Sequence, residues 1–274
     1  MRSGRVATVA AVPVDISQLL DDLRAEHADL DALVADNDLA APTPAEGWTV
    51  GDTVGHLWFF DREATRALTT PDEFTASVQA ALASPEEFMA LPEKAARELG
   101  ERLPSVWRET RADLLAALSV ADPAAKVPWY GPPMSPASFA TARLMEYWAH
   151  GQDIADGLGV TRTPTTRLRH ICHLGVRTRG FSYAVRGRQA PDVDVHVALT
   201  APDGSTWEWG DARSTEKVEG SALDFCLVVT QRRTLGDTAL RVTGDNATEW
   251  MSIAQAFAGQ PTLTDPQRAG LPVR

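Results

Sequence analysis

The sequence predicts an α plus α+β fold, with a helical bundle in the first part of the chain and a smaller mixed module in the second. Apolar residues recur at helical spacing in most segments up to residue 159, whereas residues 193–199 alternate with the period of two that is typical of a strand. The chain has 274 residues, 44% of them hydrophobic, which is enough for two modest cores. We therefore expect two domains, residues 15–160 and 161–258.

The composition excludes several classes of protein. The 26 Lys and Arg residues against 37 Asp and Glu residues give a formal net charge of -11 without a basic cluster, which argues against nucleic acid or an anionic membrane as a partner. No apolar run reaches the roughly 18 residues that a membrane span needs. Cys172 and Cys226 are isolated in the sequence, as expected in a reducing cytosol. We expect a cytoplasmic monomer or homodimer that acts on a small molecule.

The helices of the first part can be placed in order. Residues 15–36 predict a helix, because aliphatic residues recur at helical spacing: Ile16, Leu19, Leu20, Leu23, Leu30 and Leu33. A second helix is expected at residues 50–68, where Thr49 is the N-cap and Asp52 completes an acidic variant of the capping box. Residues 1–14, before the first helix, are expected to be a disordered extension.

A short helix is expected at residues 72–83 and a long one at 84–118, broken near Gly100 or Pro104. The last helix of the bundle lies within residues 135–159 and ends at Gly159.

The second part changes in character. A helix is expected at residues 164–185, and strands at 193–199 and 206–209 flank the turn-forming stretch 202–205. Further strands are expected at 217–220 and 239–243, with helices at 221–231 and 246–257 and a loose tail at 259–274.

The helix at 135–159 carries the strongest functional signal. Glu146 and His150 are four residues apart and Asp153 three further on, so the three lie on one face of a helix. Such a pair is usually a solvated surface pair, but apolar residues surround this one on most sides, which predicts a buried helix. A buried Glu and His must be paired or must bind a metal.

A third ligand is available on the helix at 50–68. His56 stands among aromatic residues, where a lone histidine is more often a packed core residue than a ligand. Together with Glu146 and His150, however, it completes the set of three ligands and an open position that is typical of catalytic zinc and of other divalent metals. His170 and His173 form a second candidate cluster, but no carboxylate accompanies them, and we favour packing roles.

Two further groups are open to two interpretations. Trp129 and Tyr130, in the loop before the helix at 135–159, either roof the site and bind a cofactor or cover the end of the bundle. Asp153 and Asp61 either orient the ligating imidazoles, a role that histidine ligands usually require, or make ordinary hydrogen bonds on their helices.

The chain resembles the actinobacterial mycothiol-dependent maleylpyruvate isomerase family from about residue 14 to 258. The resemblance is carried by residues 47–50 (GWTV) with His56 and Asp61, by residues 143–153 (RLMEYWAHGQD), and by residues 224–233 (DFCLVVTQRR). It implies a DinB-like four-helix bundle that holds a metal through His56, Glu146 and His150, followed by a sterol-carrier-like α/β domain. It also implies that an arginine, Arg232 or Arg233, assists the substrate.

The resemblance implies a zinc-dependent isomerase or thiol transferase that uses mycothiol. The thiolate would add to an activated alkene, the adduct would rotate, and elimination would complete a cis-trans isomerisation, while the arginine holds a substrate carboxylate. Two alternatives remain: a thiol-independent hydrolase, lyase or cyclase in which the metal activates water, and a non-catalytic metal- and ligand-binding protein. The set also fits non-haem iron. Because structural zinc sites usually have four protein ligands, the three found here favour catalysis.

Overall fold

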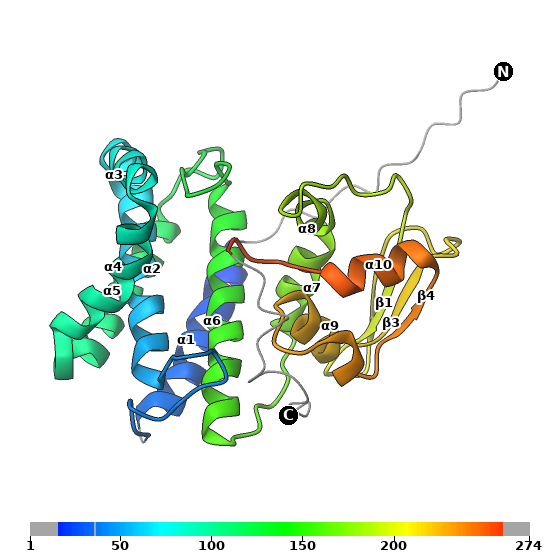
Figure 1. Cartoon of the computed structure of the whole chain (residues 1–274), viewed down its shortest axis with the longest axis horizontal. Coiled ribbons are helices and arrows are strands. Elements are labelled where there is room, and N and C mark those ends of the chain that lie inside the picture. Colours follow the sequence, from blue (N-terminus) through cyan, green and yellow to red (C-terminus); the bar gives the residue numbers. More distant parts are fainter. Residues whose placement is uncertain (1–15, 36, 260–274) are drawn as a thin grey trace.

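The computed structural model describes residues 16–35 and 37–259. Figure 1 shows a helical part beside an α/β part, which confirms the predicted fold class. The extension predicted at 1–14 and nearly all of the tail predicted at 259–274 lie outside the described residues.

Four helices form the predicted bundle: α1 (Ile16–Ala35), α2 (Val50–Thr69), α5 (Leu103–Ser119) and α6 (Pro136–Leu158). Helix α2 packs against α5, and α1 packs against α6. The predicted cap of α2 is confirmed, because the Thr49 side chain accepts a hydrogen bond from the backbone of Asp52 while the Asp52 side chain accepts one from the backbone of Thr49. Helix α6 begins after the N-cap Ser135 and ends at Gly159, which adopts the left-handed conformation.

Two more helices, α3 (Pro71–Ala83) and α4 (Pro85–Leu99), precede α5, and a 3₁₀ turn, η1 (Gly100–Arg102), joins α4 to α5. The predicted break falls at Gly100, where a positive φ of 53° interrupts the helix. Helix α4 packs closely on α2, since a Cβ added to Gly55 would overlap the Cβ of Ala96.

Up to residue 259, where the described residues end, the α/β part contains four helices, a 3₁₀ turn and four strands: α7 (Leu168–Arg177), α8 (Arg179–Ala184), β1 (His196–Thr200), β2 (Thr206–Trp209), β3 (Lys217–Ser221), α9 (Ala222–Val229), η2 (Leu235–Asp237), β4 (Arg241–Thr243) and α10 (Asp245–Ile253). The sheet order is β2-β1-β3-β4, with β1 and β3 parallel and the other pairs antiparallel. Helix α9 packs against both α7 and the sheet.

One expected element is wrong. The single helix expected at 164–185 is two helices, α7 and α8, separated at Thr178. The Thr178 backbone leaves the helical region (φ -90°, ψ 10°), and its hydroxyl bonds to the carbonyls of Leu174 and Gly175, which satisfies the end of α7.

The two parts are joined by buried ionic contacts as well as by the chain. Glu26 of α1 is only 1% exposed and accepts hydrogen bonds from Arg162 and Arg167, which lie in the connection between α6 and α7. Arg162 also bonds to the carbonyl of Trp148 in α6, at 2.8 Å. The connection is therefore held against both α1 and α6.

The two cysteines meet in the α/β part. Cys172 of α7 and Cys226 of α9 are both free and buried, with their Sγ atoms 3.5 Å apart. Their separation in the sequence conceals this contact, which the packing of α7 against α9 creates. Among the described helices, none is long and apolar enough to cross a membrane.

Candidate metal centre

Three side chains from two helices converge inside the bundle. His56 belongs to α2, while Glu146 and His150 lie one turn apart on α6, and the packing of α2 against α6 brings them together. Each offers one ligand atom that lies within 4.8 Å of the other two. Nε2 of His150 is 3.3 Å from Oε2 of Glu146. Within residues 16–35 and 37–259, no other group of three such side chains converges in this way.

The surroundings set the charge of these groups. Burial, followed by the neighbouring His150, lowers the pKa of His56 to about 3. Burial alone would raise the pKa of Glu146, but the hydrogen bond from His150 and the nearby Arg143 bring it down to about 2. At neutral pH the site therefore offers a neutral imidazole at His56 and an ionised carboxylate at Glu146, the protonation states that metal binding requires.

Two aromatic residues that the sequence analysis did not assign to the site border the histidines. The Trp48 ring stacks on that of His150, with centroids 5.9 Å apart and planes at 11°, and its centroid is 5.1 Å from that of His56. The Phe60 ring lies 4.7 Å from His56, centroid to centroid. Phe60 follows His56 by one helical turn, and this spacing is the signal that could have identified it.

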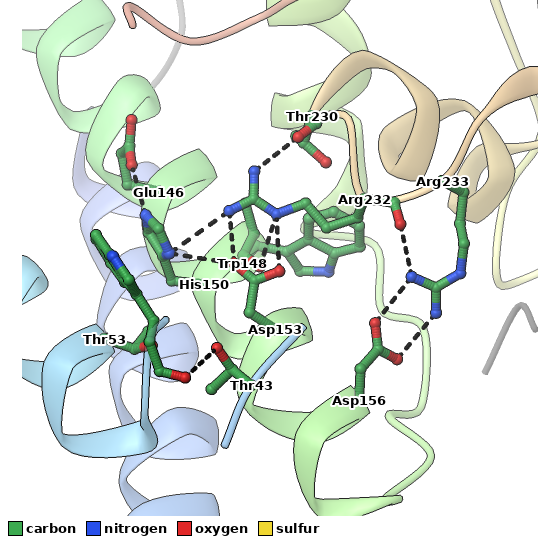
Figure 2. A network of polar contacts seen from close by, with 12 residues as sticks. Thr43, Thr53, Glu146, Trp148, His150, Asp153, Asp156, Thr230, Arg232 and Arg233 are labelled. Atoms are coloured by element: carbon green, nitrogen blue, oxygen red, sulfur yellow. Dashed lines mark hydrogen bonds and ion pairs between the residues drawn. The ribbon is translucent and has the colours of Figure 1, made fainter. Parts of the chain in front are cut away.

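Asp153 lies where the sequence predicted it, beside His150. Its Oδ2 atom is 3.3 Å from Nδ1 of His150, on the opposite side of the ring from Glu146 (Figure 2). Asp153 also accepts two hydrogen bonds from Arg232, from Nη2 to Oδ2 at 2.8 Å and from Nε to Oδ1 at 3.3 Å.

The structure separates the two arginines that the sequence analysis could not distinguish. Arg232 faces His150, and its Nη2 lies 3.5 Å from Nδ1 of that ring. Arg233 turns the other way and binds Asp156 of α6 through two hydrogen bonds of 2.8 and 2.9 Å (Figure 2). Both arginines reach α6 from the bend after α9, so the α/β part contributes directly to the surroundings of the site.

The suggested role of Asp61 in orienting a histidine is not supported by its contacts. Its carboxylate accepts hydrogen bonds from Arg143, at 2.9 and 3.1 Å, and from the hydroxyl of Tyr147. Trp107 in turn donates to that hydroxyl at 2.8 Å. Asp61 is fully buried in this network, which neutralises the guanidinium of Arg143.

Trp129 and Tyr130 lie one ring away from the histidines. Trp129 stacks on Phe74 and meets Phe60 edge-on, with centroids 6.2 Å apart, and Tyr130 packs against the same two phenylalanines. They cover the end of the bundle at α2 and α3 and touch the wall of the site through Phe60.

His170 and His173 do not form a second cluster. Nε2 of His170 is 2.8 Å from Oδ2 of Asp22 in α1, whereas Nδ1 of His173 accepts a hydrogen bond from Trp209 at 3.3 Å. Each imidazole has a separate packing partner, in agreement with the role favoured from the sequence.

The comparisons with known proteins agree with this architecture. Residues 20–155 match the family described as mycothiol maleylpyruvate isomerase N-terminal domain. Two proteins from two strains of Mycobacterium tuberculosis, both described as uncharacterized, are 48% identical to the chain over 252 residues, which is 90% of this chain and 98% of theirs.

The chain belongs to the mycothiol-dependent maleylpyruvate isomerase family. The crystal structure of a mycothiol-dependent maleylpyruvate isomerase and that of its variant with one histidine changed to alanine share the fold, with TM-scores of 0.54 and 0.56 at 15% sequence identity. Each match covers 78% of this chain and 88% of the other.

The donor set of this family member fits a divalent metal. Two imidazoles and one carboxylate, all half-buried, approach one point from α2 and α6. Three protein ligands leave room for a further ligand, as in catalytic rather than structural zinc sites. Oδ2 of Asp153 lies 3.3 Å from Nδ1 of His150, in the place of the outer contact that a ligating histidine usually makes.

Proposed function

We propose that this chain is a metal-dependent enzyme that uses a thiol, with mycothiol as its co-substrate, to isomerise an activated alkene or to transfer the thiol to it. The observation that carries this proposal is the convergence of His56, Glu146 and His150 on one point inside the bundle. Membership of the mycothiol-dependent maleylpyruvate isomerase family supports the choice of a thiol. Zinc is the proposed metal, because the two imidazoles and one carboxylate match its usual catalytic ligands.

The charges around the site favour an anionic fourth ligand. Glu146 supplies one negative charge among the three ligands, and the ion pairs Arg232–Asp153 and Arg143–Asp61 each cancel internally. A divalent ion at this point would therefore keep a net positive charge, which a thiolate neutralises. Such an ion lowers the pKa of a bound thiol, so that the thiolate, the reactive form, persists at neutral pH.

The reaction that follows is a conjugate addition and its reverse. The thiolate sulfur forms a bond to one alkene carbon, and the electron pair moves to the activating carbonyl. Rotation about the resulting single bond and departure of the thiolate restore the double bond in the trans geometry. If a proton traps the adduct instead, the product is a thioether. We propose that Trp48 and Phe60 wall the reacting groups and limit their contact with water.

The other predicted site residues have supporting roles in this proposal. Trp129 and Tyr130 would shape the far end of the site through Phe60, which supports an indirect contribution to cofactor binding. For Arg232 or Arg233 to hold a substrate carboxylate, the arginine would first have to release Asp153 or Asp156. We further propose a division into domains near residue 160 and a cytoplasmic location for the enzyme.

The first experiment measures metal and thiol binding. We expect the protein purified without added metal to contain about one zinc per chain, and calorimetric titration to show mycothiol binding that is lost in His56→Ala. The variant His173→Ala is the matched control, since His173 lies outside the site, and it should keep both. With mycothiol present, the wild type should isomerise maleylpyruvate.

The outcomes separate the proposed function from its alternatives. Zinc bound without thiol affinity would point to water-based chemistry, as in a hydrolase, lyase or cyclase. Full zinc content in His56→Ala would show that the three residues do not hold the metal. Binding of metal and thiol without turnover of any activated alkene would favour a binding protein.

A further inference from the structure

We propose that Arg232 is a positioning residue of the metal centre: it reaches out of the α/β part and holds Asp153, which holds His150 in the orientation that ligates. The affinity of the bundle for its metal then depends on how the α/β part docks. This inference rests on the proposed metal site and goes beyond it, because it assigns the second part of the chain a share in metal binding.

The first support is the way in which the backbone delivers Arg232. Helix α9 ends at Val229, and Gln231 then adopts a positive φ of 58°, the one described residue other than glycine to do so. The backbone N–H groups of Arg232 and Arg233 both bond to the carbonyl of Leu227, at 2.8 and 3.2 Å. Residues other than glycine rarely adopt this left-handed backbone conformation, and at Gln231 it turns both arginines towards α6.

The second support is the number of contacts that fix the guanidinium. Besides its two bonds to Asp153, Arg232 donates through Nε to the carbonyl of Ala149 at 3.2 Å and through Nη1 to that of Thr230 at 2.6 Å. Its side chain is 7% exposed, and that of Asp153 is fully buried. A planar fork held at this many points fixes the carboxylate that it grips (Figure 2).

The third support is the position of His150 in this chain of contacts. Arg232 Nη2 is 2.8 Å from Asp153 Oδ2, and the same Oδ2 is 3.3 Å from Nδ1 of His150. With a metal at Nε2 in place of the hydrogen bond to Glu146, the imidazole proton would lie on Nδ1, because a carboxylate is the acceptor beside it. Nε2 then keeps its lone pair on the side of Glu146, where the metal would bind.

The chain contains its own control. Arg233 and Asp156 form a second buried ion pair between the α/β part and α6, with side chains 0% and 2% exposed. Asp156 follows Asp153 by three residues on α6 and accepts a hydrogen bond from Gln152, at 3.0 Å. If docking of the two parts alone sustained the site, the two arginines would matter equally.

The test compares Arg232→Lys with Arg233→Lys in the full-length protein. Each change keeps the positive charge but removes the fork. Zinc affinity is measured by competition with a chromophoric chelator, and denaturant unfolding checks the fold. We expect Arg232→Lys to weaken zinc binding about tenfold, as loss of an outer contact to a ligand usually does. The zinc affinity of Arg233→Lys should stay within about twofold of the wild type, although this variant should lose about as much free energy of unfolding as Arg232→Lys.

A double-mutant cycle tests whether Arg232 acts through Asp153. Asp153→Asn alone should also weaken zinc binding, and the double variant should be no weaker than the worse single one, because both remove the same interaction. Additive losses would overturn the proposal, as would equal losses in Arg232→Lys and Arg233→Lys.

Hydrogen exchange of the wild type covers the case in which a variant fails to fold. If docking of the α/β part raises zinc affinity, bound zinc must stabilise docking by the same factor, because coupling is reciprocal. Zinc should therefore slow amide hydrogen exchange in residues 227–233 by that factor. Unchanged exchange in a protein that binds zinc would refute the positioning role. A wild type that binds no zinc would instead refute the proposed function itself.

Discussion

Asp61 holds a charge in the interior of the bundle, and its contacts define its role. Burial raises the pKa of its carboxyl group, while the ion pair with Arg143 and the hydrogen bond from Tyr147 lower it. Arg143 is itself only 4% exposed, so the two charges depend on each other. Asp61 therefore serves the stability of the bundle and does not contact the proposed metal ligands.

We expect Asp61→Asn to lower the free energy of unfolding by about 3 kcal/mol, because it leaves Arg143 buried without a counter-charge. Zinc stoichiometry should be unchanged under conditions in which the variant is folded. Glu146→Gln is the contrasting variant, which should lose zinc at a smaller cost in stability. Loss of zinc from a stable Asp61→Asn protein would restore the ligand-orienting role considered from the sequence.

His27 gives the protein a defined response to acid. The residue is 3% exposed, and neither ring nitrogen has a hydrogen-bond partner among the described residues. Burial, followed by the nearby charges of Arg111 and Arg143, lowers its pKa well below the usual 6.5. As the pH falls below 6.5, His27 takes up a proton in the unfolded chain but stays neutral in the folded chain, so the folded state loses stability.

The variant His27→Leu should show a shallower loss of stability between pH 6.5 and 5. The expected difference in slope is up to about 1.4 kcal/mol per pH unit, the value for one proton. The measurement is denaturant unfolding of the metal-free protein at a series of pH values, with the wild type in parallel. Because the other histidines are common to both proteins, equal slopes would contradict the assignment.

At the scale of elements, the close packing of α4 on α2 depends on Gly55, the residue before His56. A methyl group there would overlap the Cβ of Ala96, which lies on the helix packed against α2. Elsewhere in the chain, Gly180 of α8 faces open space. The two glycines therefore make different contributions to stability.

We expect Gly55→Ala to destabilise the protein by about 1–3 kcal/mol through overpacking, despite the better helix propensity of alanine. Gly180→Ala is the matched control and should stabilise by up to about 1 kcal/mol, because it restricts only the unfolded chain. Thermal unfolding of both variants beside the wild type tests the pair. A Gly55→Ala protein as stable as the wild type would show that α4 shifts to accommodate the methyl group at little cost.

The sequence contained most of what defines α2 and α6. Local signals mark their ends, namely the Thr49 cap and Gly159, and the spacing of Glu146 and His150 placed both side chains on one face. The break at Thr178 was not predictable in this way, since no proline or glycine occupies that position. The choice between Arg232 and Arg233 was not predictable either. It depends on the left-handed backbone at Gln231, a position where the sequence has no glycine to indicate it.

At the scale of the whole molecule, the arrangement of the two parts was beyond the reach of the sequence. The residues that join them lie far apart in the chain, as Glu26 and Arg167 or Asp153 and Arg232 do, and each is an ordinary charged residue when considered alone. Periodicity identifies the face of a helix but not its partner, so the aromatic wall formed by Trp48 also became visible only in the fold.

The connection between the parts offers a test of their docking. Glu26→Gln removes the buried charge that holds Arg162 and Arg167, so trypsin should cleave after these arginines faster than in the wild type. Asp29→Asn is the control, because Asp29 is 51% exposed and its pair with Arg167 is a surface contact. Equal cleavage rates in Glu26→Gln and wild type would show that docking relies on other contacts.

The buried pair Cys172 and Cys226 has a practical consequence for a protein with a proposed thiol co-substrate. Burial, followed by the hydrogen bond with Cys172, raises the pKa of Cys226 well above its usual value, so its reactive thiolate is scarce at neutral pH. Neither sulfur is exposed to solvent. A colorimetric thiol reagent added to the folded protein should thus register mycothiol alone, and the two cysteines should react only after denaturation.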